Sequence, residues 1–423
     1  MTALEKAGPA VRAVLERCLS GHDLGESEGL VLAEVTGADL AATIEVADAV
    51  RRAQVGGAVT YVQNRNVNFT NVCVKACRFC AFSRTQRSEQ GYFLPVEEIV
   101  ARAVQARELG ATEVCIQAGL APGMDGWLYV TICRAIKAAC PDLHLHAFSP
   151  EEIQYGAGLA GVSFAEYLTA LKDAGLGTLP GTSAEILDDA VRAKIAPGRI
   201  TTAAWIEVVT TAHRLGLPTT ATMMFGHVES PADRVRHLAL LGRLQAETGG
   251  FTEIVPLSFV HAEAPMYARN LVPGLRAGPS DDDVVRTHAL CRLMLGRAFR
   301  NVQVSWVKLG LPRSSALLAA GCNDLGGTLM NESISTSAGA GHGQHASPAA
   351  LRAAIRAAGR IPAERDTRYR LRRTFADPAE DPVEPLDRIA DPSAAFGSYA
   401  ALTRDTRFRF VPPPRASKAG PTP

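Results

Sequence analysis

The stretch Cys73-Val74-Lys75-Ala76-Cys77-Arg78-Phe79-Cys80 places three cysteines at spacings of four and three residues. Three thiolates so close together can bind one cube-shaped iron–sulfur cluster. Clusters that only carry electrons usually take four cysteine ligands, so three ligands leave one iron open. An open iron suits a cluster that binds a substrate or cofactor directly. Cys73, Cys77 and Cys80 are therefore predicted to be metal ligands and catalytic residues that hold one [4Fe–4S] cluster.

Two other uses of these cysteines remain open. A structural zinc site needs four ligands, typically from two Cys or His pairs, and Cys77 with Cys80 supplies one such pair. A disulfide framework belongs to secreted chains with an even number of cysteines, whereas this chain has 9. A non-catalytic iron–sulfur or zinc-binding protein is the alternative from another functional class.

The composition favours a large globular chain in a reducing compartment. The 423 residues are 47% hydrophobic and 21% charged, with a net charge of +1. This balance gives no sign of binding to nucleic acid or to an anionic membrane. No apolar run is long enough to span a membrane, and the N-terminus lacks the apolar segment of a signal peptide. We expect a cytoplasmic location, with neither nucleic acid nor membrane as a partner.

Short β-rich runs alternate with amphipathic helices from about residue 60 onward. The helix expected over residues 95–109, for example, ends at Gly110, a common C-terminal cap. Eight strands separated by helices predict a parallel sheet, and the number suits a TIM-type (β/α)8 barrel of the α/β class. A doubly wound open sheet is the alternative, although no G-x-G-x-x-G motif follows the first strand. The expected strands are 67–70, 113–117, 143–148, 177–179, 219–225, 253–259, 302–307 and 323–329.

The pattern divides the chain into three regions. Residues 1–55 are expected to form an N-terminal helical cap, and residues 56–360 the barrel. Arg, Asp and Pro dominate the C-terminal extension, 361–423. We expect it to be a loosely ordered tail whose last ten or so residues are disordered.

In a barrel of this type, functional residues lie at the carboxyl ends of the strands. There the small residues of Gln117-Ala118-Gly119 would let a ligand approach the backbone, although a plain tight turn explains them equally well. The stretches 149–152 and 182–185 have the pattern of helix capping boxes. Capping alone would account for Ser149 and Glu185, and a ligand contact is the alternative for each. Residues 223–225, two methionines and a phenylalanine, are expected in the core or in the wall of a pocket.

Several stretches together resemble the FO synthase subunit that joins tyrosine to a ribitylaminouracil, a member of the radical S-adenosylmethionine (SAM) superfamily. The resemblance covers about residues 55–365. The cysteine motif indicates only the superfamily, and the later stretches indicate the subgroup. The stretches are NRNVNFTNVC (64–73), CRFCAF (77–82), EVCIQ (113–117), HAFSP (146–150), PGTSAEIL (180–187), TMMFGH (222–227), GGFTE (249–253), SWVKLG (305–310) and NDLGGTLM (323–330).

The resemblance implies a radical SAM barrel and a reaction. S-adenosylmethionine would bind the open iron and yield a 5′-deoxyadenosyl radical, which would take a hydrogen from L-tyrosine. The 4-hydroxybenzyl fragment of tyrosine would add to 5-amino-6-(D-ribitylamino)uracil, releasing 2-iminoacetate. A second radical SAM subunit would then close the deazaflavin ring, and flavodoxin or ferredoxin would supply electrons. The chain contains one C-x3-C-x2-C motif, so it is not a fused synthase that carries both radical centres.

The same reasoning assigns site residues. Phe79, Gln117, Gly119 and Glu185 are expected to bind the cofactor. The residues expected to bind the substrates are His146, Ser149, His261, Glu263, Ser305, Asn323 and Asp324.

Two departures from the family pattern leave the substrate open. The family usually has a second glycine where Ala118 stands and a Gln-Asn pair in place of Ala262-Glu263. Sister enzymes of the futalosine route to menaquinone, dehypoxanthine futalosine cyclase and aminofutalosine synthase, share the stretch 184–187 and the Met223-Met224 pair. They are the alternative within the radical SAM class.

Overall fold

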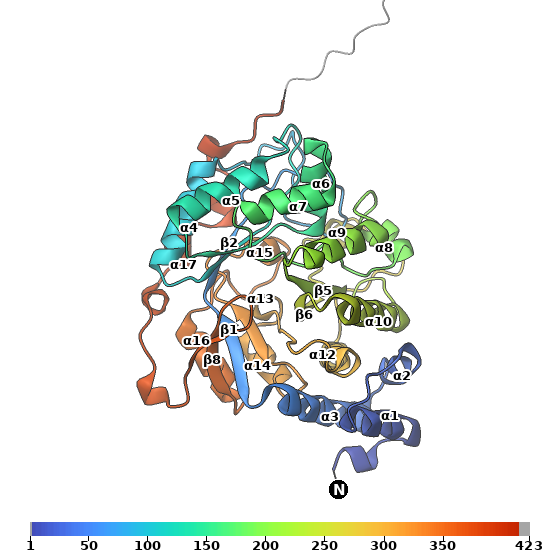
Figure 1. Ribbon diagram of the computed structural model, residues 1–423. Helices are drawn as coiled ribbons and strands as arrows, with labels where there is room; N and C mark the ends of the chain where they lie inside the picture. Colours follow the sequence, from blue (N-terminus) through green and yellow to red (C-terminus); the bar gives the residue numbers. More distant parts are fainter. Residues whose placement is uncertain (1, 414–423) are drawn as a thin grey trace, which may run out of the picture.

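A computed structural model describes residues 2–413 of the chain. Its centre is a ring of parallel strands surrounded by helices (Figure 1). The first strand position of the ring consists of two consecutive strands. Two other positions are only two residues long, Thr178–Leu179 and Val302–Gln303, and each is joined to its neighbours by isolated bridges. The strands of the ring are β1 (Ala58–Val62), β2 (Asn64–Val67), β3 (Glu113–Ile116), β4 (His144–Ala147), β5 (Thr219–Phe225), β6 (Phe251–Ser258) and β7 (Asp324–Gly327).

Parallel pairing closes the ring. β2 pairs with β3 and β3 with β4, and the bridges at Thr178 and Leu179 connect β4 to β5. β5 pairs with β6, the bridges at Val302 and Gln303 connect β6 to β7, and β7 pairs with β1. The predicted (β/α)8 barrel is confirmed, and an open doubly wound sheet is excluded.

Three strand boundaries differ from those expected. The first strand lies earlier than 67–70, and Thr70 and Val72 form only isolated bridges beyond it. The seventh position ends before Ser305, because Trp306 begins a short helix. The last strand, β7, begins at Asp324, close to the expected residue 323, but ends at Gly327 rather than at 329. An apolar run in a sequence shows that a strand exists, whereas pairing with its neighbours decides where the strand begins and ends.

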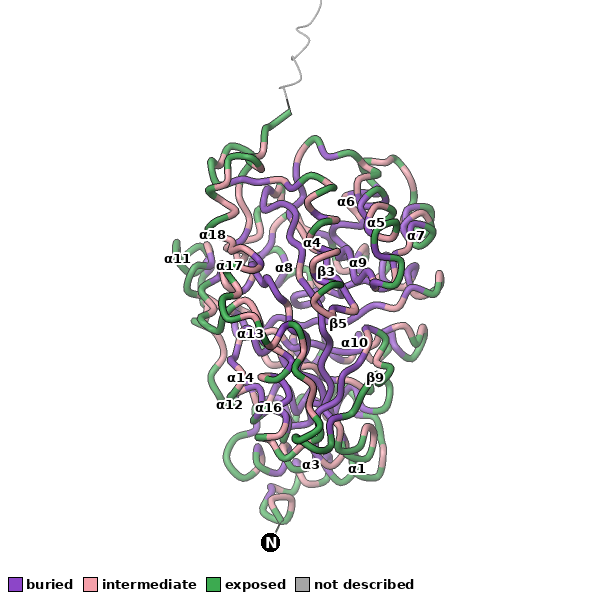
Figure 2. The backbone as a smooth tube through the Cα atoms, turned by 90° about the vertical axis from the view of Figure 1, so that its left-hand side faces the viewer, coloured by how far each residue is buried: buried purple, intermediate pink, exposed green. Residues whose placement is uncertain are grey.

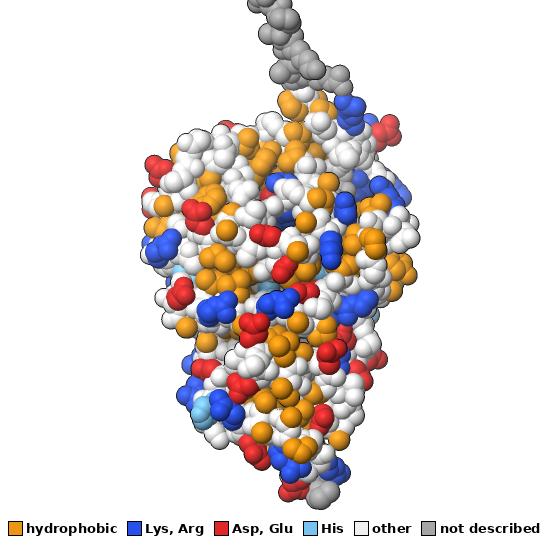
Figure 3. Space-filling view, turned by 90° about the vertical axis from the view of Figure 1, so that its right-hand side faces the viewer, with side chains coloured by type: hydrophobic (Ala, Val, Ile, Leu, Met, Phe, Trp, Pro, Cys, Tyr) orange, Lys and Arg blue, Asp and Glu red, His pale blue; other side chains and the backbone are white. Residues whose placement is uncertain are grey.

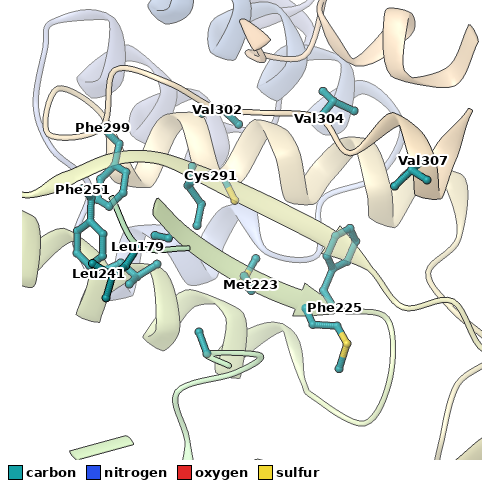
Figure 4. Close-up of a cluster of buried hydrophobic side chains, with 14 of the residues drawn as sticks. Leu179, Met223, Phe225, Leu241, Phe251, Cys291, Phe299, Val302, Val304 and Val307 are labelled. Atoms are coloured by element: carbon teal, nitrogen blue, oxygen red, sulfur yellow. The ribbon is translucent and has the colours of Figure 1, made fainter. Parts of the chain in front are cut away.

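Side chains of β5 alternate between the barrel interior and the surrounding helices, as a strand requires. Met223 and Phe225 are fully buried and lie in a hydrophobic cluster with Leu241 and Cys291 of neighbouring helices (Figure 4). Met224 lines the central cavity instead. The prediction of core and pocket wall is confirmed for this stretch.

The helices cover the outside of the barrel and its N-terminal end. Figure 2 shows buried backbone through the middle of the molecule and mixed burial along the outer helices. The larger helices are α1 (Pro9–Leu19), α2 (Glu26–Leu32), α3 (Gly37–Val55), α4 (Val96–Glu108), α5 (Leu128–Ala139), α6 (Pro150–Ala160), α7 (Phe164–Asp173), α8 (Asp189–Ile195), α9 (Thr202–Arg214), α10 (Pro231–Thr248), α12 (Asp281–Leu295), α14 (Leu311–Leu317) and α16 (Pro348–Ala357). Four-residue or five-residue helices are α11 (Pro265–Ala268), α13 (Trp306–Leu309), α15 (Ile334–Ser337), α17 (Pro392–Phe396) and α18 (Tyr399–Leu402).

The N-terminal helices form the expected cap. α3 packs against α12, and α2 packs against α10. In Figure 1 these blue helices lie together at the lower end of the barrel. The buried apolar residues of the cap include Val11, Leu15 and Leu32.

The C-terminal extension begins as part of the sheet. β8 (Ile361–Arg365) pairs in parallel with β1, and β9 (Leu371–Thr374) pairs antiparallel with β8. Residues beyond β9 run along the barrel and include α17 and α18. The division after residue 360 stays a prediction, and the expected disorder of the last ten or so residues concerns residues outside the described range.

Surface features agree with a mixed charge composition. On the face shown in Figure 3, basic and acidic side chains are interspersed with hydrophobic ones. None of the helices within residues 2–413 is both long enough and apolar enough to cross a membrane.

The segment from Arg365 to Tyr369 reaches the carboxylates of the barrel interior. Arg365 Nη2 donates to Asp324 Oδ1 at 3.1 Å, and Thr367 Oγ1 donates to Glu113 Oε2 at 2.6 Å. The Tyr369 hydroxyl donates to Glu253. Asp324 is 0% exposed and Arg365 2% exposed, so this ion pair lies in a low-dielectric interior.

We expect Arg365→Met to destabilise the fold by about 3–5 kcal/mol, because it leaves the Asp324 carboxylate buried without its counter-charge. The matched control is Arg370→Met, which removes an exposed Arg370–Asp366 ion pair and should cost about 1 kcal/mol or less. Urea unfolding followed by circular dichroism measures both. Equal, small losses in the two variants would show that the C-terminal segment does not stabilise the barrel.

Candidate functional site

A cavity of about 400 Å³ lies within the barrel and is lined by the inward-facing side chains of its strands. Every second residue contributes: Asn64, Asn66 and Asn68 from the first strand and its continuation, for example, and Glu113, Cys115 and Gln117 from the next. Cys73, Cys77, Cys80 and Phe79 line the same cavity. The fold therefore brings the cysteine loop and the strand ends together.

Backbone hydrogen bonds hold the cysteine loop against segments that follow other strand positions. The Val74 N–H donates to the carbonyl of Leu120 at 2.9 Å, and the Arg78 N–H donates to that of Ile195 at 2.8 Å. The Arg78 carbonyl accepts from the Met266 N–H at 2.7 Å. Within the loop, the Cys80 N–H donates to the Cys77 carbonyl at 3.1 Å. The loop is thus shaped by the barrel as a whole and not by its own sequence alone.

The chemistry of this loop fits an iron–sulfur cluster. Burial raises the pKa of the Cys77 thiol to about 12, and it also raises the pKa of Cys73, so these thiols need a strong cationic partner to ionise. Among residues 2–413, no three Cys, His, Asp or Glu side chains are grouped closely enough to hold one metal ion. A [4Fe–4S] cluster does not need the three thiols to converge on one ion, because each cysteine would bind a different iron.

Arg199 supplies positive charge beside the loop. Its guanidinium lies 5.4 Å from the centre of the Phe79 ring, donates to Ser183 Oγ at 2.8 Å and pairs with Glu185. Burial lowers the pKa of Arg199, but Glu185, Cys77 and Glu151 raise it, and the net shift is upward. Arg199 is a permanent cation that can compensate a thiolate-bound, anionic cluster.

Glu185 does not belong to a capping box, contrary to the pattern of residues 182–185. No helix begins there, and the next helix, α8, is capped by Asp188. Glu185 instead has φ of +41°, a left-handed conformation that is costly for a residue other than glycine. Its carbonyl accepts from the Met224 N–H at 2.9 Å, and its carboxylate pairs with Arg199. Capping therefore no longer explains this residue.

The turn after β3 is explained largely by packing. A Cβ on Gly119 would lie 2.3 Å from the Val72 carbonyl oxygen, so glycine is required there by the backbone of the cysteine loop. Ala118 donates its N–H to Glu152 Oε1 at 2.9 Å. Gln117 lines the cavity, with its Oε1 3.5 Å from Thr182 Oγ1. Of the three, Gln117 is the one that offers a side chain to a ligand.

The capping box at 149–152 is confirmed. Ser149 accepts from the Glu152 N–H, and Glu152 Oε2 accepts from the Ser149 N–H at 2.7 Å. Burial raises the pKa of Glu152 to about 7. Both residues also line the cavity.

His146 and Ser305 also lie at the cavity. Burial lowers the pKa of His146, so the ring is neutral near pH 7, and its Nδ1 lies 2.8 Å from Thr178 Oγ1. Ser305 lines the cavity, and its side chain does not cap α13. Three of the seven expected substrate residues, His146, Ser149 and Ser305, therefore meet in one place.

The other four expected substrate residues lie outside the cavity lining. Glu263 is exposed, and His261 packs its ring against Tyr267. Asn323 accepts from Arg292 at 2.7 Å, and Asp324 pairs with Arg365. Asn323 and Asp324 stand at the beginning of β7, where the strand expected over 323–329 also has them, and the carboxyl end of that strand is formed by later residues.

Several lining residues were not among the expected site residues, although Glu253 and Lys308 lie in the stretches 249–253 and 305–310 that resemble the family. Arg199 lies in a loop between helices, Glu253 faces inward from β6, and Lys308 and Glu332 follow the last two strand positions. Alternation along a strand could have indicated Glu253 once the strand register was known. Arg199 and Glu332, which lie in loops, follow no such alternation.

A second cavity of about 240 Å³ adjoins the first. Asn66 and Asn68 line both, and the remaining wall includes residues of α17, α18 and the segment after them. Asn68 Oδ1 is buried without a hydrogen-bond partner among the described residues. The C-terminal extension thus encloses additional polar space beside the central cavity.

Solved structures share the fold. The chain matches HydG from Carboxydothermus hydrogenoformans with a TM-score of 0.66 and 17% identity, over 85% of this chain and 80% of that one. It matches methylornithine synthase (PylB) with a TM-score of 0.62 and 16% identity, over 83% of this chain and 97% of that one. At these identities the matches support the barrel and nothing finer.

Family models and curated relatives are more specific. Residues 67–241 match the radical SAM superfamily, and residues 248–377 match the CofH/MqnC C-terminal region. The chain is 48% identical to the 5-amino-6-(D-ribitylamino)uracil–L-tyrosine 4-hydroxyphenyl transferase of Methanothermobacter thermautotrophicus, over 85% of this chain and 97% of the relative. The corresponding transferase of Methanocaldococcus jannaschii is 47% identical over 77% of this chain and 90% of the relative.

Longer relatives contain the same region. The FO synthase of Mycobacterium tuberculosis strain H37Rv is 48% identical over 82% of this chain, and the match spans 40% of that relative. The cofactors of the superfamily are a [4Fe–4S] cluster and S-adenosylmethionine. This chain therefore belongs to the radical SAM family of the 5-amino-6-(D-ribitylamino)uracil–L-tyrosine 4-hydroxyphenyl transferases.

Proposed function

We propose that this radical SAM enzyme joins the 4-hydroxybenzyl fragment of L-tyrosine to 5-amino-6-(D-ribitylamino)uracil, releasing 2-iminoacetate, in the synthesis of the deazaflavin FO. The observation that carries the proposal is the match along 97% of a transferase of that name. The buried cavity supports it, since a carbon radical must be kept from water and stray hydrogen donors. The sister enzymes of the futalosine route remain the alternative that a product assay separates.

Cys73, Cys77 and Cys80 would hold the [4Fe–4S] cluster. When bound, the cluster and S-adenosylmethionine supply a 5′-deoxyadenosyl radical, which takes a hydrogen atom from the substrate. Arg199 would balance the charge of the cluster and hold the Glu185 carboxylate in place. Phe79 would flank the adenine, and Gln117 and Glu185 would bind polar parts of the cofactor. Gly119 would keep the Val72 backbone close to that site.

The substrates would lie deeper in the barrel, among His146, Ser149 and Ser305. The uracil has many donors and acceptors, and such a ligand needs several convergent polar side chains. The two adjoining cavities, of about 400 and 240 Å³, would together accommodate the cofactor and the two substrates.

Other partners follow from the reaction. Each turnover consumes an electron, for which a flavodoxin or ferredoxin is a suitable donor. A second radical SAM subunit would close the deazaflavin ring. The FO synthases support this, because the region that matches this chain is 40% of their length. A cytoplasmic location is supported by nine cysteines that form no disulfide.

Anaerobic reconstitution with L-tyrosine and the diaminouracil should give a product with the mass of their adduct. Cys77→Ala should abolish both the adduct and 5′-deoxyadenosine, because the cluster loses a ligand. The control is Cys133→Ala, which changes a buried cysteine on α5 and should keep about four irons per chain and the activity. Mass spectrometry and iron analysis give the readouts. Retained 5′-deoxyadenosine formation in Cys77→Ala, or cofactor cleavage by the wild type without an adduct, would contradict the proposal.

Glu185→Gln should weaken binding of S-adenosylmethionine about tenfold, because the variant loses a charged acceptor in a buried site. Calorimetry on the reconstituted protein measures the dissociation constant. The control, Glu166→Gln, changes a carboxylate that caps α7 on the surface and should leave the affinity unchanged. If wild type and Glu185→Gln bind S-adenosylmethionine with equal affinity, then Glu185 does not contact the cofactor and only positions Arg199.

Glu263→Asn restores one residue of the usual family pattern, and we expect it to change the rate of adduct formation by less than about twofold. Glu263 is exposed and outside the cavity lining, where substitutions have small effects. Steady-state rates with both substrates test this. A several-fold increase would mean that the loop carrying Glu263 reaches the substrates during turnover.

A further inference from the structure

Lys308 presents a cation to the central cavity from a firmly held position. It lies on α13, directly after the seventh strand position, and lines the cavity. Trp306, on the same short helix, is 2% exposed and donates its Nε1–H to the Gly327 carbonyl at 2.8 Å. The Lys308 N–H donates to the Ser305 carbonyl at 3.1 Å. The backbone that carries Lys308 is thus anchored to β7.

Three of the four cationic side chains that line the cavity already have partners. Lys75 pairs with Glu151 at 3.1 Å, Arg199 pairs with Glu185, and Arg365 pairs with Asp324. Lys308 Nζ makes no ion pair or hydrogen bond with any residue in the described range, 2–413. A lysine that is desolvated without a partner is unfavourable unless a ligand completes the site.

The complementary charge that acts on Lys308 is Glu332, which also lines the cavity. Glu332 is fixed by the N–H groups of Ser335 and Thr336, at 2.7 and 3.2 Å. Burial lowers the pKa of Lys308, whereas Glu332 raises it. The two groups attract each other, but among the described residues they form no ion pair.

A lysine without an ion-pair partner and a carboxylate on the wall of the same cavity are complementary to an amino-acid zwitterion. Under the proposed function, the amino and carboxylate groups of S-adenosylmethionine are taken by the open iron, and the diaminouracil carries no carboxylate. L-tyrosine is then the one ligand with a carboxylate and an ammonium still to be bound. Charge complementarity of this kind decides which substrate a buried site accepts.

We propose that Lys308 and Glu332 form the subsite for the amino-acid backbone of tyrosine, with Lys308 binding the carboxylate and Glu332 the ammonium. This inference rests on the proposed function and deepens it. It also explains how the enzyme fixes the end of tyrosine that leaves as 2-iminoacetate, while the 4-hydroxybenzyl end stays free to reach the diaminouracil.

The test pairs each side chain with the substrate group that it is proposed to bind. Calorimetry on the anaerobically reconstituted holoenzyme with S-adenosylmethionine would measure binding of L-tyrosine and of tyramine, which lacks the carboxylate. Lys308→Met should weaken binding of L-tyrosine about 10- to 100-fold and leave that of tyramine within about threefold of wild type. Lys308→Arg should recover part of the loss, because it keeps the charge.

Two further variants complete the binding experiment. Glu332→Gln should weaken L-tyrosine about tenfold but leave 3-(4-hydroxyphenyl)propanoate, which lacks the ammonium, near its wild-type affinity. Lys172→Met is the control, because Lys172 is exposed and bonded to the Leu215 carbonyl. Lys172→Met should change neither the affinity for L-tyrosine nor that for 3-(4-hydroxyphenyl)propanoate.

The outcomes separate the inference from the function on which it rests. Equal weakening of L-tyrosine and tyramine in Lys308→Met, or no weakening of either, would overturn the subsite. Adduct formation by the wild type together with either result would leave the proposed function standing. A wild-type holoenzyme that binds no L-tyrosine and forms no adduct would instead overturn the proposed function.

Discussion

A closed parallel barrel forces every second side chain of its strands into one confined interior, and here that interior is charged. Glu113 and Glu253 face inward from β3 and β6, where water cannot screen them and unpaired charges are strongly unfavourable. Asn64 and Gln303 of neighbouring strand positions donate to them. Their other partners come from a distant part of the chain, since Thr367 and Tyr369 bond to the two carboxylates. The segment after β8 is therefore part of the barrel interior, although it lies beyond the last strand of the ring.

The same constraint arranges the mouth of the barrel. The cysteine loop is held by backbone bonds to Leu120, to Ile195 at the end of α8 and to Met266 of α11, so its shape depends on segments that follow three other strand positions. Arg199 connects this loop to Glu185 through a buried ion pair. Because burial strengthens both attraction and desolvation, the charged groups around the cavity act as linked pairs whose geometry is fixed before any ligand arrives.

The fold and the chemistry of this enzyme are separable. HydG and methylornithine synthase share the barrel at 16–17% identity, whereas the two named transferases are 47–48% identical to this chain. Function therefore resides in the lining of the cavity, as expected for barrels that host many reactions. In this chain the lining combines a cysteine loop, a set of buried carboxylates and a lysine that has no partner among the described residues.

The sequence by itself determined the barrel, the helical cap and the cysteine loop, because these depend on local patterns: strand–helix alternation, helix periodicity and cysteine spacing. It also predicted the capping box at Ser149 correctly. Local patterns failed where the tertiary structure decides. Asn323 and Asp324, expected to bind the substrates, stand at the start of β7 outside the cavity lining, and Glu185 resembles a cap although no helix begins there. Only the tertiary structure brought the loop residues Arg199 and Glu332 to the cavity and showed that Lys308 of the stretch 305–310 lines it. Such residues acquire their neighbours through the closure of the barrel and not through their spacing in the chain.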